Sequence, residues 1–280
     1  MAPRRRARRA VPAAGTNPDL SCIAGRPGAE RRVLRVARLG LVDYQEAWDL
    51  QRRLAEARRH DRIGDVMLLL EHPHTYTLGR RGKHEHVLLT RQQLQRKNIT
   101  LYEVDRGGDV TYHGPGQLVG YPIFKLPGTR LDRVGYLRDL EMALLQAVRS
   151  LRIDAGLRAG LSGVWVADDK ICALGAKIDA HGITTHGFAL NVNTDLEYFQ
   201  LIVPCGITGE LVTSLEHETG AQMNLDDVAR SAAGHFAQVF ASDVQWVDTL
   251  DALLGRSVGV PMQPPAELRK LRGDDEIFRA

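Results

Sequence analysis

Cysteine is scarce in this sequence, and long apolar runs are missing. The 280 residues include three cysteines, Cys22, Cys172 and Cys205, too few and too odd in number for a disulfide scaffold. No stretch approaches the ~20 consecutive apolar residues that a membrane-spanning helix needs. We therefore expect no membrane partner and a reducing, cytoplasmic setting, in which each cysteine is a free thiol.

The net charge is also small, and it is unevenly distributed. The formal charge is +3, but residues 1–32 hold eight arginines against Asp19 and Glu30. That segment is therefore +6, and the remaining residues sum to −3. Because the basic balance belongs to this segment and the rest is slightly acidic, we expect no nucleic-acid partner.

Three stretches of the chain differ in composition. Hydrophobic residues at 44% and charged residues at 25% are ordinary for a globular protein. Residues 1–32 are rich in Arg, Ala and Pro without an apolar period, so we predict a disordered N-terminal tail. Residues 251–280 turn polar and Pro-rich, which predicts a loose C-terminal tail. Between them, residues 33–250 lack a linker, so we predict one folded domain.

Hydrophobic spacing within residues 33–250 switches between the strand and the helix period. Strands are predicted at 33–42, 65–71, 101–106, 109–113, 117–126, 163–167, 171–178 and 185–192. Helices are predicted at 44–59, 91–97, 132–151, 195–202 and 225–240, with Asp43 and Thr90 as N-caps of the first two. Strand runs interrupted by a few helices predict an α+β fold, a mixed β-sheet flanked by helices.

Glycine gathers in one segment, Arg106-Gly-Gly-Asp-Val-Thr-Tyr-His-Gly-Pro-Gly-Gln-Leu-Val-Gly-Tyr-Pro122. Glycine weakens a strand unless a bulge or a ligand needs close approach of the backbone. The segment therefore predicts a binding wall of exposed backbone amides. A turn-rich hairpin without a ligand is the alternative, and the spacing matches neither a P-loop nor a dinucleotide fingerprint.

Cys205 lies in a Pro-Cys-Gly turn after the short helix predicted at 195–202. A thiol there is a candidate nucleophile, but it needs a nearby cation to ionise at neutral pH. Spacing leaves four candidates for that cation, which are His113, Lys170, Lys177 and His186. A buried, unreactive thiol is the alternative.

Two His-x-His pairs and one basic loop allow further interpretations. His72 with His74 and His84 with His86 have the i, i+2 spacing that puts two ligands on one face of a strand. We expect no metal at either pair. Arg80, Arg81 and Lys83 form a basic loop, which is either solvated or a docking patch for an acidic partner.

Five motifs in order resemble the lipoyl/octanoyl-protein transferase family over roughly residues 33–230. They are Glu71-His-Pro-His-Thr-Tyr-Thr-Leu-Gly79, RGGDVTYHGPGQLVGYPI (106–123), Lys170-Ile-Cys-Ala-Leu-Gly175, THGFALNVNTDL (185–196) and PCGITGELVTSL (204–215). The long glycine-rich block is highly specific, and Lys170 together with Cys205 sharpens the match.

The resemblance implies transfer of an octanoyl group from acyl carrier protein to a lysine of a lipoyl domain. Such domains occur in 2-oxoacid dehydrogenases and in the glycine cleavage H protein. The family works through a cysteine thioester, which here maps to Cys205, with Lys170 as the activating lysine and Lys177 as the less favoured partner. The resemblance also implies a substrate-binding wall, formed by Arg106, Gly107, Gly108, Asp109, Val110, Thr111, Tyr112, His113, Ala173, Leu174, Gly175, Gly187, Phe188 and Ala189.

The resemblance implies a fold like the catalytic domain of biotin and lipoate protein ligases. Those ligases activate a free acid with ATP and need no catalytic cysteine, so an ATP-dependent lipoate or biotin ligase is the alternative function. Cys205 favours ATP-independent transfer, for which we expect no cofactor and a monomeric enzyme.

Overall fold

A mixed sheet runs through the described part of the chain, which in this computed structural model is residues 31–127, 133–203 and 212–254. Its spatial order is β11 (Ser242–Val247), β1 (Arg32–Leu41), β2 (Asp65–Glu71), β6 (Gln117–Ile123), β10 (Thr184–Asn191), β9 (Asp169–Ile178), β8 (Leu161–Val166) and β7 (Ala155–Arg158). Strand β1 pairs in parallel with β11 and β2, and the other neighbours are antiparallel. The predicted α+β fold with a mixed sheet is confirmed.

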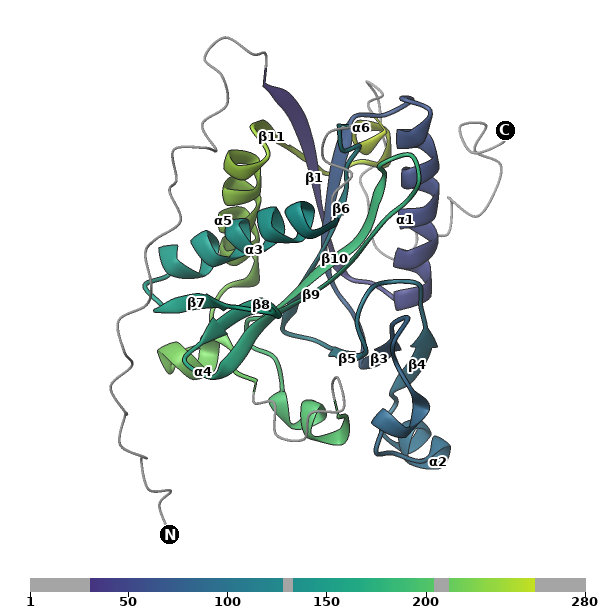
Figure 1. Ribbon diagram of the computed structural model, residues 1–280, viewed down its shortest axis with the longest axis vertical. Helices are drawn as coiled ribbons and strands as arrows, with labels where there is room; N and C mark the ends of the chain where they lie inside the picture. The colour runs from purple at the N-terminus through teal and green to yellow at the C-terminus, as the bar shows by residue number, and fades with distance from the viewer. Residues whose placement is uncertain (1–30, 128–132, 204–211, 255–280) are drawn as a thin grey trace. The chain divides into compact units, whose positions relative to one another are not determined.

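Helices cover both faces of this sheet. Figure 1 shows α1 (Tyr44–Arg59) on one side, and α3 (Arg133–Ser150) and α5 (Leu225–Val239) on the other. Helix α1 starts where predicted, because the Asp43 carboxylate accepts hydrogen bonds from the amides of Gln45 and Glu46. Its buried residues Leu50 and Leu54 pack in one cluster with the α1-facing residues of β2.

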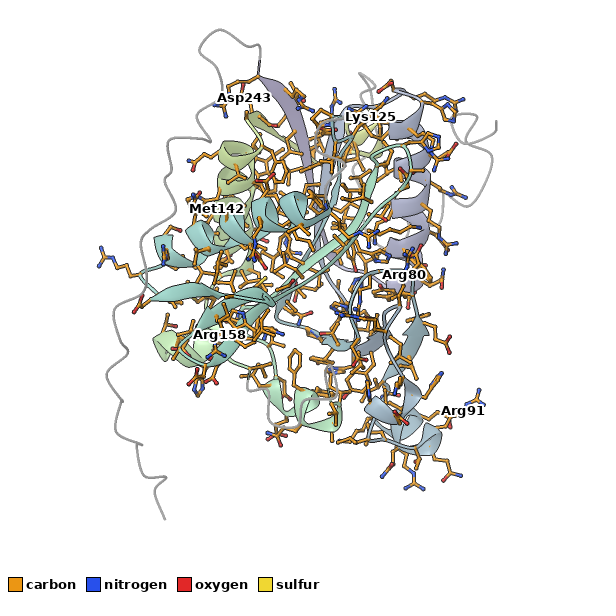
Figure 2. The ribbon with its side chains drawn as sticks, in the orientation of Figure 1. Arg80, Arg91, Lys125, Met142, Arg158 and Asp243 are labelled. Carbon is orange, nitrogen blue, oxygen red and sulfur yellow. The ribbon has the colours of Figure 1, made fainter. Side chains whose placement is uncertain are left out.

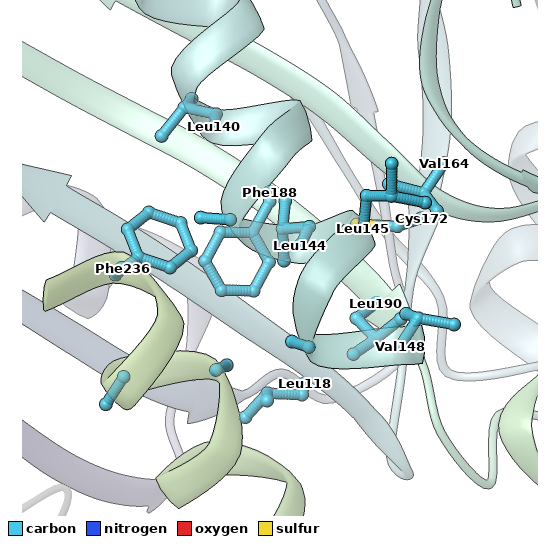
Figure 3. Packing of buried hydrophobic residues seen from close by; sticks show 14 of the residues in the cluster. Leu118, Leu140, Leu144, Leu145, Val148, Val164, Cys172, Phe188, Leu190 and Phe236 are labelled. Atoms are coloured by element: carbon cyan, nitrogen blue, oxygen red, sulfur yellow. The ribbon is translucent and has the colours of Figure 1, made fainter. Parts of the chain in front are cut away.

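The larger core lies between the sheet and the pair α3 and α5. Figure 3 shows Phe188 of β10 beside Leu144 of α3 and Leu190 of β10 beside Val148 of α3, with Phe236 of α5 next to Phe188. The two phenyl rings stack with centroids 5.3 Å apart. Each fully buried side chain of this size contributes on the order of 1.5–3 kcal/mol, so this face fixes β9 and β10 in place.

A second, smaller sheet has the order β4 (Thr100–Glu103), β3 (Thr75–Leu78) and β5 (Val110–His113). It forms its own cluster around the buried rings of Tyr76 and Tyr112. Short helices surround it, namely η2 (His84–His86), α2 (Arg91–Arg96) and η4 (Leu196–Leu201). Because β5 ends at His113 and β6 begins at Gln117, a three-residue turn joins the two sheets.

Most predicted elements are confirmed, and the differences have local reasons. Strand β3 was not predicted, because it is four residues long and lies between Pro73 and Gly79. The edge strands β7 and β11 were also not predicted, because neither contains a long apolar run. The predicted strand at 101–106 stops at Glu103, because the chain turns there toward Arg106. The helix predicted at 195–202 is the 3₁₀ helix η4.

The predicted tails, residues 1–32 and 251–280, lie almost entirely outside the described residues. Strand β1 begins at Arg32, and the Arg31 guanidinium forms an ion pair with Asp243 at 2.8 Å. At the other end, α4 (Leu215–Thr219) and β11 are followed by α6 (Leu250–Leu253), where Leu253 is buried. Within these described ranges, none of the helices combines the length and hydropathy needed to cross a bilayer.

Candidate active site

Strands β9 and β10 bring two of the predicted wall segments together. The register pairs Ala173 with Ala189, Leu174 with Phe188 and Gly175 with Gly187. Residues directly opposed across a strand pair share one face of a sheet. Leu174 and Phe188 belong to the α3 and α5 core, whereas Ala189 belongs to the α1 cluster. The small residues therefore lie together on the α1 side of the sheet.

The loop Arg106–Gly108 lies across this strip of small residues. The Gly107 amide donates to the Ala176 carbonyl at 3.4 Å. A side chain at Gly175 would place its Cβ 3.0 Å from Arg106 Cδ and 3.2 Å from the Gly107 carbonyl oxygen. Three predicted segments, far apart in the sequence, thus meet at the middle of β9.

Arg106 holds this loop to the second sheet. Its Nη2 donates to the Thr77 carbonyl at 2.7 Å and to Thr77 Oγ1 at 2.8 Å, and its Nε also donates to that hydroxyl at 3.2 Å. Its Nη1 donates to the Gly107 carbonyl at 2.9 Å, and the residue is 7% exposed. Arg106 therefore fixes the position of the Gly107 loop relative to β3 of the second sheet.

The glycines of the 106–120 block have different reasons to be glycine. A Cβ at Gly114 would overlap the Tyr112 hydroxyl, at Gly116 it would lie 2.4 Å from the Asn193 carbonyl, and at Gly120 2.1 Å from the Phe188 ring. These three serve the protein's own close packing. At Gly107 the nearest atom is 3.5 Å away, so here a small residue is not required by packing, and space over the backbone remains.

The next predicted residues enter the second sheet. Asp109 is buried, and its carboxylate lies 2.7 Å from His86 Nδ1 and 2.6 Å from the Val110 amide. Val110 and Tyr112 point into the cluster of that sheet, while Thr111 alternates to the other side and is half-buried. The Tyr112 ring stacks on Tyr198 of η4 at 4.9 Å. This part of the predicted wall therefore supports the site through packing.

His113 is buried, and its hydrogen bonds fix its protonation state. The Gln117 amide nitrogen donates to the Tyr112 carbonyl and to Asn191 Oδ1, so Gln117 Oε1 must accept from His113 Nδ1, 2.9 Å away. On the other side, Nε2 lies 3.5 Å from Thr77 Oγ1, which already accepts from Arg106. A protonated ring would find no acceptor there, and burial sets the pKa of His113 well below its ordinary value. His113 is therefore a neutral imidazole.

The same hydrogen bonds continue toward Lys170. Asn191 Nδ2 donates to the Thr213 carbonyl at 3.0 Å, and the Thr213 amide donates to the Lys170 carbonyl at 3.0 Å. Gln117, Asn191 and Thr213 are each at most 4% exposed. A continuous buried chain thus links the predicted wall at His113 to the strand position of Lys170.

Lys170 is the half-buried second residue of β9. Its Nζ lies 4.6 Å from the centroid of the Trp165 ring, within the range of a cation–π contact. Its backbone pairs in parallel with Val212, outside the regular strands. The chain therefore returns to the sheet at Lys170 directly after residues 204–211.

Cys205 and its Pro-Cys-Gly turn lie outside the described residues, but both flanks of residues 204–211 are placed. Before them, the Val203 amide donates to the His86 carbonyl at 2.8 Å, and Ile202 pairs with Val87. After them, Val212 pairs with Lys170. The segment that holds Cys205 thus connects the end of η2, beside the second sheet, to the Lys170 end of β9.

Lys177 of β9 and His186 of β10 are two other candidate cations, and both contact Asp105. They lie at the end of the β9–β10 pair that is distant from Lys170. Lys177 Nζ lies 2.5 Å from Asp105 Oδ2, and His186 Nε2 lies 2.7 Å from Oδ1. The hydrogen bond from His186, followed by that from Lys177, lowers the pKa of Asp105 below its ordinary value. Burial lowers the pKa of His186. Both candidates are therefore engaged with one carboxylate.

Cys172 and the histidines of the two His-x-His pairs, all of them described in the structure, do not assemble into a metal site. Burial raises the pKa of the Cys172 thiol, which suits an unreactive core residue. His72 contacts the Val42 carbonyl and the Tyr121 hydroxyl, and burial lowers its pKa to about 4. His74, His84 and His86 each bond to a different residue. Among the described residues, no group of three His, Cys, Asp or Glu side chains is arranged to hold a metal ion.

Three residues at this site were not singled out from the sequence, namely Gln117, Trp165 and Asn191. Gln117 begins β6 and Asn191 ends β10, and both are buried polar residues next to an apolar run of their strand. That signal was available, because buried polar groups require partners. Trp165 gave no such signal, since an aromatic residue in a buried strand is ordinary.

Comparison with known proteins gives a consistent relationship over most of the chain. Residues 43–237 match the family described as the lipoyl protein ligase A/B catalytic domain. An octanoyltransferase of Roseiflexus sp. (strain RS-1) is 48% identical over 211 residues, covering 75% of this chain and 88% of that relative. An octanoyltransferase of Koribacter versatilis (strain Ellin345) is 42% identical over 248 residues, covering 87% and 98%.

Solved structures support the fold. A bipartite lipoate protein ligase from Thermoplasma acidophilum superimposes with a TM-score of 0.62 at 17% identity, covering 80% of this chain and 91% of that chain. A lipoate-protein ligase A bound with ATP gives 0.60 at 17% identity, covering 81% and 93%. At these identities the likeness concerns the fold, and it confirms the predicted ligase-like architecture.

Proposed function

The chain belongs to the lipoyl protein ligase A/B catalytic domain family, and from this we propose that it transfers an octanoyl group through a thioester on Cys205. It is an acyltransferase, as its octanoyltransferase relatives are. The proposed donor is octanoyl-acyl carrier protein. The proposed acceptors are the lysines of lipoyl domains in 2-oxoacid dehydrogenases and in the glycine cleavage H protein. We place the reaction in the cytoplasm and the enzyme in a monomeric state.

One observation carries the assignment of the two catalytic residues. The segment that holds Cys205 rejoins the sheet at Val212, whose backbone partner is Lys170. Lys177, the other lysine of β9, is paired with Asp105. Lys170 is therefore the β9 lysine whose strand position adjoins the cysteine segment, which supports its role beside the nucleophile.

In the first half-reaction, the Lys170 ammonium stabilises the Cys205 thiolate, because an opposite charge nearby favours the ionised form. The thiolate attacks the carbonyl of the carrier thioester. A new carbon–sulfur bond forms to Cys205, the bond to the carrier thiol breaks, and the departing thiolate takes a proton from Lys170. One thioester replaces another at nearly equal free energy, so this step needs no nucleotide.

In the second half-reaction, the acceptor lysine attacks the Cys205 thioester. Its amine must lose a proton as the amide forms, and the now neutral Lys170 accepts that proton. The carbon–sulfur bond breaks, and the Cys205 thiolate beside the Lys170 ammonium is restored. Formation of an amide from a thioester is downhill, which gives the transfer its direction.

The octanoyl chain is proposed to lie beside the small residues on the α1 side of β9 and β10, next to the loop that contains Gly107. Ala173 with Ala189 and Gly175 with Gly187 leave this strip without large side chains. Each buried methylene contributes about 0.8 kcal/mol. An eight-carbon chain therefore gains several times that amount, which is enough to select chain length.

The basic loop is the proposed contact for the acidic carrier protein. Arg80, Arg81 and Lys83 are exposed, and Arg80 is labelled in Figure 2. The amides of Arg80 and Arg81 donate to the carbonyls of Arg106 and Gly108 at 3.1 and 3.0 Å. An acidic partner bound here would lie directly beside the Gly107 loop, where charge complementarity speeds association.

Intact-mass spectrometry after mixing the full chain with octanoyl-carrier protein tests the proposal. We expect a mass increase of one octanoyl group that is labile to hydroxylamine and that peptide mapping assigns to Cys205. Cys205→Ser should not accumulate the label, and Cys172→Ser is the matched control that should. A label on Cys22 or Cys172 would refute the assignment of the nucleophile.

A parallel incubation with ATP and free octanoic acid separates transfer from ligation. The ATP-dependent ligase alternative predicts an acyl-adenylate and modification of a lipoyl domain without any carrier protein. We expect neither product. Their formation together with an unlabelled Cys205 would favour the ligase.

A further inference from the structure

Trp165 lies directly opposite Lys170 in the β8–β9 hairpin. The two residues are register partners, so their side chains leave the sheet on the same face. The Lys170 Nζ lies 4.6 Å from the centroid of the indole ring. A cation at this distance over an aromatic face is attracted by the ring's electron density.

The backbone around this pair is shaped to bring the two side chains together. Val164 opposes Cys172 but its neighbour Trp165 opposes Lys170, so β9 carries one extra residue here. A bulge of this kind changes the direction of the adjacent side chains and is often found near active sites. Gly163 has φ +134°, and a Cβ there would lie 3.3 Å from Lys170 Cε and 3.4 Å from Trp165 Nε1.

The Trp165 indole occupies this place in spite of an unsatisfied polar group. The residue is 3% exposed, and within the described part of the chain its Nε1 has no hydrogen-bond partner. A buried indole N–H usually finds one. A leucine or phenylalanine would avoid that penalty, so the feature that favours tryptophan here is its large, electron-rich ring face.

We propose that Trp165 is a positioning residue for acyl transfer, whose ring face holds the ammonium of Lys170, the residue whose backbone pairs with Val212. The inference rests on the proposed function for the role of Lys170 itself. Lysine has a long flexible side chain, and a fixed ring that attracts its ammonium reduces the number of positions it samples.

Charged groups of several elements surround this pair. Arg158 of β7 contacts the same ring at 4.9 Å and pairs with Asp168 in the hairpin turn; it lies at the β7–β8 edge in Figure 2. Asp169 of β9 interacts with His217 and Glu218 of α4 as well as with Arg158 and Asp168. Glu141 of α3 and Lys170 both act on Cys172. Arg158 repels the Lys170 ammonium, whereas the carboxylates of Asp168, Asp169, Glu218 and Glu141 attract it. These charges act in addition to the contact between the ammonium and the Trp165 ring.

Nuclear magnetic resonance tests the contact without relying on activity. Lysines of the full chain are reductively methylated with a ¹³C label, which keeps their charge, and the Lys170 signal is identified by its loss in Lys170→Arg. We expect an upfield ring-current shift of this signal in the parent and in Trp165→Phe, and its disappearance in Trp165→Met. Trp48→Met, which removes a ring that contacts Arg52 at 4.5 Å, is the control that should leave the signal unmoved.

Alkylation of Cys205 by iodoacetamide tests the functional part. Trp165→Met should slow alkylation near pH 7 by about three- to tenfold and move its pH midpoint upward, and Trp165→Phe should recover part of the loss. A purely structural ring would change the melting temperature but leave the pH midpoint in place. If the upfield signal is absent from the parent, or if alkylation is equal in all variants, the proposal is wrong.

Two further arms keep the outcomes separate. If Trp165→Met does not fold, incorporation of trifluorotryptophan withdraws electron density from the ring at nearly constant shape, and the same slowing of alkylation is expected; an unchanged rate would refute the proposal. If the parent takes up no octanoyl group, the proposed function fails, whereas the upfield signal still decides whether Trp165 holds Lys170.

Discussion

The two ends of strand β9 place a lysine in opposite surroundings. At one end, Lys170 faces the Trp165 ring, and its backbone receives the chain that follows the Cys205 segment. At the other end, Lys177 is paired at 2.5 Å with Asp105, which also bonds to His186. The Lys177 ammonium is paired with a carboxylate, whereas the Lys170 ammonium lies over an aromatic ring.

In the proposed mechanism, seven residues on one strand separate a lysine with a chemical role from a lysine with a structural role. An ammonium that stabilises a thiolate must keep its charge available and its position defined. The Trp165 ring helps to define the position of the Lys170 ammonium, and the Lys177 ammonium holds Asp105.

Changes at Lys170 should have the largest effect. Lys170→Ala removes both the charge and the proton acceptor, and Lys170→Arg keeps the charge but cannot accept a proton. Both should lower transfer to a lipoyl domain by a factor on the order of 10²–10⁴. Lys170→Arg should retain more alkylation of Cys205 by iodoacetamide near neutral pH than Lys170→Ala. Near-normal transfer by Lys170→Arg would eliminate the role of proton acceptor.

A change midway along β9, at the Gly107 loop, should have a smaller effect. In Gly107→Ala the added Cβ has its nearest neighbour, the Ala176 carbonyl oxygen, at 3.5 Å, an ordinary contact. We therefore expect an unchanged melting temperature. If the octanoyl chain or its carbonyl approaches this backbone, transfer should fall about tenfold through a raised KM, the loss expected for ~1.4 kcal/mol of binding.

Gly234→Ala in α5 is the matched control, because nothing lies within 4 Å of its added Cβ. It should leave KM unchanged. Equal KM values for Gly107→Ala and the parent would place the acyl chain elsewhere.

The sequence predicted the sheet and its main helices because their apolar periods are long. Helix α1 and strand β2 show this most clearly, since burial follows the predicted spacing. Strand β3 could not be predicted in this way. Its four residues form a strand because β4 and β5 pair with them, and such long-range pairing has no local signal.

Only part of the site could be predicted, because some of its features depend on contacts between residues distant in the sequence. Motifs led to the two strands of the wall, whose register the structure supplies. The sequence could not distinguish a glycine that serves packing, such as Gly120 against Phe188, from one that leaves open space, such as Gly107. Nor could it show that Arg106 is engaged with Thr77. These distinctions depend on neighbours that are distant in the chain.

At the other end of β9, Lys177→Met should change transfer by less than about twofold. Its ammonium is engaged with Asp105, and the side chain is matched in length by methionine. Transfer to a lipoyl domain, measured beside Lys170→Ala, checks this. A Lys177→Met enzyme as inactive as Lys170→Ala would mean that the roles of the two lysines are reversed.

The smallest expected effect of Lys177→Met is on stability, and it depends on pH. The pKa of Asp105 is lowered in the folded state, first by His186 and then by Lys177. The ionised Asp105 therefore adds to the free energy of unfolding at any pH above its ordinary pKa of about 4, and this contribution is lost as pH falls through the lowered pKa. The side chains of Lys177 and Asp105 are 32% and 41% exposed, so the pair contributes only about 0.2–1 kcal/mol. Guanidinium unfolding of the parent and of Lys177→Met at pH 7, 5, 4 and 3 gives the gap, which is the difference between their free energies of unfolding. This gap should be small, constant down to about pH 4, and smaller below it.

The charge of Lys177 also opposes protonation of His186. Removing Lys177 makes that protonation easier in the folded state, which narrows the gap further in acid. A gap that widens between pH 5 and pH 3 would contradict the assignment of Asp105 as the partner that Lys177 stabilises.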